Sequence, residues 1–218
     1  VPRPGPSARD HFPLRSEAAR KCDGGIAPPK EPPVPAFWDG ADARGVPWRT
    51  LAGVDFVIDQ TYAADPDDVA RAYTESDLYE VIGEMSSRAR PEILARTVDD
   101  VGKVLFQIRY RFAGNLNSVV RAVLDPQKLS WVEHSTHEVA RRHVDYRIVP
   151  DNYADRFRVS AKCTTRPGPS GGAIRTVEGS VRFKAPLVAG AVEKTIVSAL
   201  REHLASEKAA VERFLAAM

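Results

Sequence analysis

One nine-residue stretch limits the possible folds more than any other part of the chain. From Val104 to Phe112 an apolar side chain occupies every second position, with Gln107, Arg109 and Arg111 between them. Successive side chains of a strand point to opposite faces, so this period of two places five apolar groups on one face. A sheet with one dry face and one wet face is typical of antiparallel pairing. The stretch therefore predicts an antiparallel sheet that is covered on one side only.

A long amphipathic helix is predicted at the C-terminal end. After Pro186 apolar residues recur every three or four positions as far as Leu215. A helix of about 29 residues from Val188 would span roughly 43 Å, long enough to cross a whole sheet. His203 stands at the edge of the apolar stripe, one turn before Glu207, and we expect these two residues to form a surface pair.

The remaining elements follow from periodicity and turn residues. Asp65 and Pro66 are typical of a helix start, and a second short helix is predicted from Ser76 or Asp77. Residues 115–124 fit either a short helix or a crossing loop. The predicted strands are 54–62, 92–98, 104–112, 129–139, 143–149, 157–163 and 174–183. The order of strand, two short helices, further antiparallel strands and one long helix indicates an α+β domain over residues 54–218.

The first fifty residues differ in composition from this domain. They hold ten of the 17 prolines, and five of these lie between residues 28 and 35. Proline lacks an N–H and fixes φ, so residues 1–50 are predicted to be disordered or loosely docked. The segment is interpreted either as a linker or over-extended start, or as a docking segment for a proline-recognising domain. Phe37, Trp38 and Trp48 favour some contact with the domain surface.

Charge and cysteine content exclude several classes of function. The net charge is +2, from 31 Lys and Arg against 29 Asp and Glu, which gives no strong field for nucleic acid. The two cysteines, Cys22 and Cys163, fit no disulfide framework or metal motif, so we expect free thiols in the cytoplasm. No apolar run approaches the ~20 residues of a membrane span, and the N-terminus does not look like a signal peptide.

Three stretches of the domain resemble the START-like (SRPBCC) superfamily, which includes polyketide cyclases, plant pathogenesis-related allergens and steroid transfer domains. These stretches are residues 56–69, residues 109–138 and residues 179–193. More narrowly, they are similar to an uncharacterised bacterial branch found mainly in actinobacteria. The resemblance implies the helix-grip fold, in which a curved antiparallel sheet closes over the C-terminal helix. It also implies a cavity between sheet and helix for a lipid, sterol or aromatic polyketide.

The favoured hypothesis is therefore a carrier of a hydrophobic small molecule, with no cofactor and no metal. Its ligand is expected to touch the apolar strand faces and the helix stripe, in a cavity above about 300 Å³. The candidate ligand-binding residues are Phe106, Ile108, Tyr110, Phe112, Tyr146, Phe157, Val159, Val192, Ile196 and Leu200. Tyr110 and Tyr146 need hydrogen-bond partners when buried, either in a ligand or in the backbone.

A catalytic alternative rests on Glu133 and His137, which share one face of their strand. An imidazole beside a carboxylate is suited to acid–base chemistry, as in a cyclase or aromatase. A metal site at His134, His137 and His143 is disfavoured, because neighbouring strand positions three apart point to opposite faces.

A third hypothesis is a protein-interaction domain that docks through residues 1–50. Arginines on outward strand positions, such as Arg109 and Arg147, predict a solvated sheet face or, alternatively, peripheral contact with an anionic membrane. The oligomeric state is left open.

Overall fold

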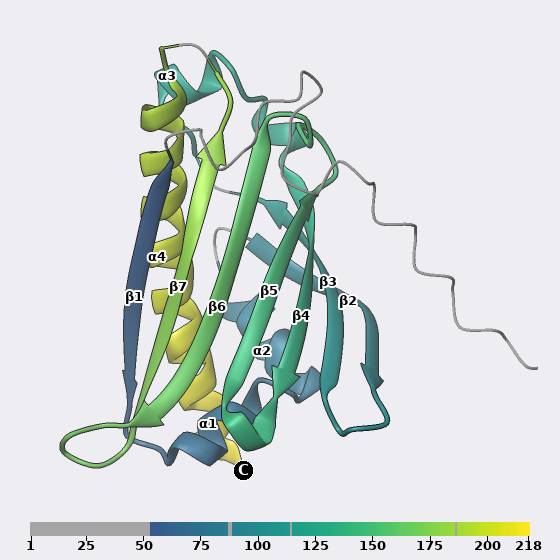
Figure 1. The fold of residues 1–218 in the computed structure, drawn as a ribbon, viewed down its shortest axis with the longest axis vertical. Coiled ribbons are helices and arrows are strands. Elements are labelled where there is room, and N and C mark those ends of the chain that lie inside the picture. Colours follow the sequence, from purple (N-terminus) through teal and green to yellow (C-terminus); the bar gives the residue numbers. More distant parts are fainter. Residues whose placement is uncertain (1–52, 87–88, 114, 186) are drawn as a thin grey trace, which may run out of the picture. The chain divides into compact units, whose positions relative to one another are not determined.

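The computed structural model describes residues 53–86, 89–113, 115–185 and 187–218. They form a curved, seven-stranded antiparallel sheet with one long helix, α4, lying along it (Figure 1). This is the α+β helix-grip architecture predicted from the sequence. The expectation for residues 1–50 lies outside the described residues.

The sheet has the strand order β1-β7-β6-β5-β4-β3-β2, and every neighbouring pair is antiparallel. The strands are β1 (Val54–Tyr62), β2 (Ala89–Val98), β3 (Val104–Phe112), β4 (Ser130–Glu138), β5 (His143–Pro150), β6 (Phe157–Pro167) and β7 (Ala173–Phe183). The helices are α1 (Pro66–Ala72), α2 (Ser76–Met85), α3 (Ser118–Arg121) and α4 (Ala189–Ala217), with 3-10 turns η3 (Pro126–Lys128) and η4 (Val139–Arg141). Strand β7 pairs with β1, so the first and last strands are neighbours beside α4.

Local sequence explains most of these boundaries. The Asp65 side chain accepts a hydrogen bond from the Asp67 N–H and so caps α1, with Pro66 at the first helical position. The second helix begins at Ser76 as expected, although Glu75 is its N-cap and makes no side-chain bond. Strand β2 has a bulge between Ile93 and Ala95, where one residue is left without a partner on β3.

Three apolar clusters follow one another along α4. At one end, α1 and α2 pack with β2 and β3 against the last turns of α4, around Val211. In the middle, β1, β5, β6 and β7 contact α4 at Val197 and Leu204. At the other end, Val120 of α3 meets Val192 in the first turns of α4. The core therefore lies between the sheet and the helix layer, on one side of the sheet.

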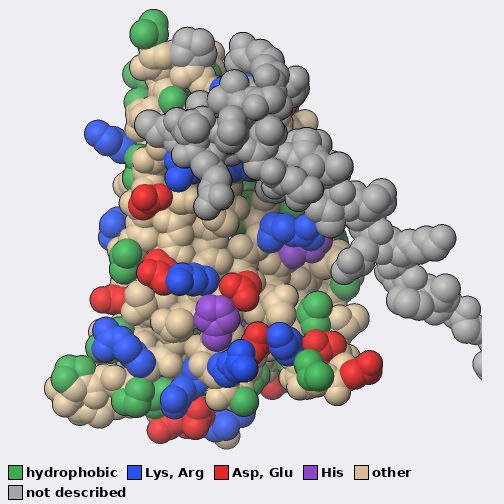
Figure 2. Space-filling view, in the orientation of Figure 1, with side chains coloured by type: hydrophobic (Ala, Val, Ile, Leu, Met, Phe, Trp, Pro, Cys, Tyr) green, Lys and Arg blue, Asp and Glu red, His purple; other side chains and the backbone are tan. Residues whose placement is uncertain are grey.

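The opposite face of the sheet is polar. Figure 2 shows Lys and Arg side chains interspersed with Asp and Glu across this face. Several of them are paired across strands, including Lys162 with Glu178 at 2.9 Å and Arg109 with Asp151 at 3.9 Å. Such mixed pairing suits a solvated surface more than contact with an anionic membrane. Within the described ranges, no helix is long and apolar enough to cross a membrane.

Candidate functional site

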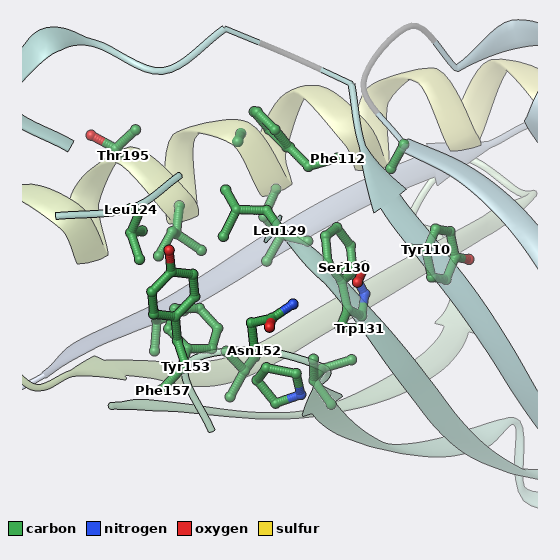
Figure 3. A pocket seen from close by; sticks show the side chains of 18 of the residues that line it. Tyr110, Phe112, Leu124, Leu129, Ser130, Trp131, Asn152, Tyr153, Phe157 and Thr195 are labelled. Atoms are coloured by element: carbon green, nitrogen blue, oxygen red, sulfur yellow. The ribbon is translucent and has the colours of Figure 1, made fainter. Parts of the chain in front are cut away.

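A cavity of about 220 Å³ lies between the sheet and the first half of α4. Its walls come from strands β2 to β7, from the segments after β3 and after β5, and from α4 (Figure 3). Most of the lining is apolar. The lining residues are Ala89, Tyr110, Phe112, Leu116, Val120, Leu124, Leu129, Ser130, Trp131, Glu133, Ile148, Pro150, Asn152, Tyr153, Phe157, Val159, Val181, Thr195, Ile196, Ala199, Leu200 and His203.

The crossing segment between β3 and β4 covers one end of the cavity. The Asn117 side chain caps α3 by accepting from the Val120 N–H at 2.9 Å, and its amide donates to the Thr195 hydroxyl of α4 at 3.3 Å. Asp125 caps η3, and its N–H donates to the Tyr153 hydroxyl at 3.1 Å. These bonds hold the apolar side chains of the segment over the cavity. Both alternatives predicted for residues 115–124 were partly right, since a one-turn helix sits inside a crossing loop.

Aromatic side chains form the wall on strands β3 and β4. Strand register places Tyr110 opposite Trp131, and their rings stack with centroids 5.6 Å apart at an interplanar angle of 15°. The His203 ring of α4 packs edge-on against Tyr110, at 5.8 Å between centroids. Burial raises the pKa of the Tyr110 phenol well above its usual range, and the nearby Glu133 adds to the effect.

Glu133 places a carboxyl group in the wall of this mostly apolar cavity. It lies on the same face of β4 as Trp131, two residues further along, and its side chain lines the cavity. The described residues offer it no hydrogen bond or ion pair. Burial raises its pKa to about 8, Glu207 adds to the rise, and Arg175 opposes it. A carboxyl of this kind exchanges a proton near neutral pH, which is the requirement for an acid–base group.

A buried polar network lies behind Glu133, around Arg175 of β7. The Arg175 guanidinium donates to Gln60 Oε1 at 2.5 Å, to the Tyr146 hydroxyl at 2.8 Å and to Glu207 Oε1 at 3.2 Å. The Tyr73 hydroxyl donates to the same Glu207 oxygen at 2.8 Å. All members are buried except Tyr146, which is half-buried, so the network fixes α4 against the sheet and is suited to a structural role.

His203 lies between this network and the cavity. Its Nε2 is 3.8 Å from Glu207 Oε2, and its Nδ1 is buried without a hydrogen-bond partner in the described part of the chain. The side chains of His203 and Glu207 are only 18% and 10% exposed. The expectation of a surface pair was therefore wrong, because the Arg175 network draws both residues inward.

The predicted ligand-binding residues divide into two groups. Six of them line the cavity: Tyr110, Phe112, Phe157, Val159, Ile196 and Leu200. The other four, Phe106, Ile108, Tyr146 and Val192, are not among the lining residues and pack in or against the core clusters. Phe106 packs against Tyr79 of α2 at 5.1 Å between ring centroids. Helix α2 thus covers the end of the strand face where Phe106 and Ile108 lie.

The structure does not pair Glu133 with His137. Four residues along one strand separate their Cα atoms by roughly 13 Å. The Nε2 of His137 is instead 2.9 Å from the Ser135 hydroxyl, and its ring packs edge-on against Phe106. Burial lowers the pKa of His137 to about 3, with a further contribution from Arg175. His137 does not line the cavity, whereas Glu133 does, so only one member of the predicted dyad is placed for chemistry.

Sequence reasoning missed Arg175, Gln60 and the inward position of His203. A signal was present for the first two. Arg175 alternates in phase with the buried Val177 and Val181, and Gln60 lies in phase with Ile58. A polar residue on the buried phase of a strand needs an internal partner. In the described ranges, no cluster of three or more His, Cys, Asp or Glu residues is placed to hold a metal ion.

Comparison with known families assigns most of the domain to one protein family. Residues 58–215 match the model of the family described as "Protein of unknown function (DUF2505)". The chain belongs to this family. No curated protein sequence matches the chain significantly.

Solved structures show the fold that this DUF2505 domain shares with other proteins. The Zhui aromatase/cyclase of Streptomyces sp. R1128 is similar with a TM-score of 0.53 and 14% identity, over 75% of this chain and 94% of that one. TTHA0849 of Thermus thermophilus has a TM-score of 0.52 and 14% identity, over 75% and 98%. Ara h 8.0201 has a TM-score of 0.50 and 14% identity, over 77% and 100%. The predicted resemblance to the START-like superfamily is thereby confirmed for the fold.

Proposed function

We propose that the DUF2505 domain binds a compact hydrophobic molecule in the cavity between the sheet and α4. The carrying observation is that apolar and aromatic side chains of strands β3 to β7 and of α4 surround about 220 Å³ that they do not fill. Well-packed interiors leave few voids larger than a water molecule. A space of this size therefore favours a binding role over a purely structural one.

The volume restricts the proposed ligand. It is below the roughly 300–1,000 Å³ of ordinary ligand pockets and below the size we expected from the sequence. An apolar cavity of about 150 Å³ holds benzene, so about 220 Å³ suits a molecule of one or two rings. A small polyketide-like aromatic fits this limit better than a long-chain lipid. The proposed compartment is the cytoplasm, which suits the free, buried thiol of Cys163.

A second candidate function is acid–base catalysis on the bound molecule, and Glu133 favours it. A cavity-lining carboxyl with a pKa of about 8 holds a proton at neutral pH and releases it readily. The identity of the ligand decides whether this property serves a reaction or only recognition.

The binding proposal is tested by titrating the labelled protein with 3-methylindole, a neutral molecule of two fused rings, in heteronuclear NMR. We expect saturable shifts centred on the cavity lining. Ala199→Leu adds three carbons from α4 into the cavity and should weaken binding at least tenfold. Ala205→Leu makes the same change on the exposed side of α4 and should leave binding unchanged.

Two outcomes would count against the binding proposal. One is the absence of saturable shifts in the wild-type protein, and the other is equal affinity in the Ala199→Leu and wild-type proteins. If the titration instead succeeds, native mass spectrometry of protein purified from its own host would identify the natural ligand.

A further inference from the structure

Of the three carboxyl groups Glu133, Glu193 and Glu207, only Glu133 lacks a hydrogen-bond or ion-pair partner among the described residues. Arg175 and Glu207 form an ion pair, and the carboxylate of Glu193 accepts a hydrogen bond from the Phe183 N–H at 2.8 Å. Glu133 has no such partner among the described residues, yet its side chain lines the cavity. A buried carboxyl group either stays protonated or acquires a positive partner. His203, also in the cavity wall, faces Glu207 at 3.8 Å, which leaves a ligand in the cavity as the source of that partner.

The surroundings of Glu133 favour a positive group over a negative one. Arg175 is already paired with Glu207 at 3.2 Å, and of the two Glu207 raises the pKa of Glu133 while Arg175 lowers it, so this ion pair supplies no free positive partner. The Trp131 ring lies on the same strand face, and Tyr110 lies diagonally across on β3. Aromatic rings attract cations through their negative faces, particularly where water is excluded.

We infer that the ligand class is a compact aromatic amine, whose protonated nitrogen pairs with Glu133 while its rings fill the apolar part of the cavity. This inference rests on the proposed binding function and adds the polar end of the ligand. The ring system lies among Leu200, Phe157 and Val159, and the ammonium lies at the Trp131 and Tyr110 wall beside Glu133.

Binding of an ammonium ion at Glu133 should make the affinity depend on pH in a characteristic way. Below pH 8 most Glu133 is protonated in the free protein, and an ammonium ion binds the ionised form. Affinity for an amine should therefore rise about tenfold per pH unit between pH 6 and pH 8 and level off above. The charged and titratable groups facing Glu133 are His203 and Glu207 of α4, Tyr79 of α2, Tyr110 of β3, Tyr146 of β5 and Arg175 of β7.

The test compares three probes of nearly equal shape by isothermal titration calorimetry from pH 6 to pH 9. Tryptamine carries the ammonium, 3-propylindole is its neutral counterpart, and indole-3-acetate carries a negative charge. For the full chain we expect tryptamine to bind at least tenfold more tightly than 3-propylindole at pH 8.5. We expect indole-3-acetate to bind most weakly. Tryptamine should also release close to one proton at pH 7, seen as a dependence of the heat on the buffer.

Glu133→Gln removes the charge and keeps the shape. In this variant tryptamine should lose at least thirtyfold in affinity at pH 8.5 and lose its steep pH dependence, while 3-propylindole changes less than threefold. Glu178→Gln removes a carboxylate from the opposite face of the sheet and serves as the matched control.

The outcomes separate the two proposals. If 3-propylindole binds as tightly as tryptamine, or indole-3-acetate binds more tightly, the amine inference is overturned and the binding function stands. If none of the three probes binds, the binding function is overturned and the amine inference with it.

Discussion

The guanidinium Nη1 of Arg175 lies 3.2 Å from the carboxylate Oε1 of Glu207, and this contact ties β7 to α4 inside the domain. The two side chains are only 3% and 10% exposed. Opposite charges in such a place attract strongly but have also lost their hydration. The effect of the pair on the free energy of unfolding should therefore be largest when only one of its two members is replaced.

We predict that Arg175→Met lowers the free energy of unfolding by about 3–5 kcal/mol, because the buried Glu207 carboxylate loses the guanidinium that compensates its charge. The double variant Arg175→Met with Glu207→Met should recover part of this loss. Urea denaturation followed by circular dichroism measures both. Lys162→Met breaks an exposed pair with Glu178 and should leave the midpoint within error. Equal destabilisation of the single and double variants would show that the ion pair is not what Arg175 contributes.

The carboxyl of Glu133 makes the domain less stable as the pH rises. Its pKa of about 8 in the folded chain lies above the ordinary value of 4.5. Between these two values the unfolded chain gives up the proton and the folded chain keeps it, so raising the pH favours unfolding. From pH 5 to pH 8, Glu133→Gln should gain on the order of 3 kcal/mol in unfolding free energy relative to wild type. A constant difference across this range would mean that Glu133 is ionised in the fold.

His137 has the opposite dependence on pH. Its pKa is about 3 in the fold against an ordinary 6.5, so the imidazole stays neutral where the unfolded chain takes up a proton. Stability that is present above pH 6.5 is lost as the pH falls toward 3. Between pH 7 and pH 5 wild type should lose about 2 kcal/mol more than His137→Gln. Nitrogen-15 NMR offers a direct check, since a charged His137 ring at pH 5 would refute the prediction.

The sequence predicted the sheet and α4 well because their signals are local. Strand β3 begins at Val104 and ends at Phe112, the first and last residues of the alternating pattern. The turn before it is held by Asp99, whose side chain accepts from the N–H groups of Val101 and Lys103. Alternation and turn chemistry act within about ten residues, so they can be identified without knowing the tertiary structure.

The site was harder to predict because it depends on which part of a face is left uncovered. Phe106 and Tyr110 share the same face of β3, yet α2 packs over Phe106 and leaves Tyr110 at the cavity. Periodicity assigns a face but not the position of the helix that covers it. His203 was misplaced for a related reason, because its partner Glu207 is held inward by Arg175, 32 residues earlier in the chain.

Two glycines offer a matched test of packing in the sheet and in α4. A Cβ at Gly179 would lie 2.2 Å from the Ser160 carbonyl oxygen and 2.8 Å from the Phe56 ring, so the strands would have to separate. Gly179→Ala should therefore lower the unfolding free energy by about 2–3 kcal/mol.

A Cβ at Gly190 would meet nothing within 4 Å. Gly190 lies in the first turn of α4, where alanine is the better helix former, so Gly190→Ala should stabilise the domain by about 0.5–1 kcal/mol. Thermal and urea unfolding of the two variants measure both the expected loss of stability in Gly179→Ala and the expected gain in Gly190→Ala. A neutral Gly179→Ala variant would mean that β1 does not lie as close to β7 as the register of Phe56 with Gly179 requires.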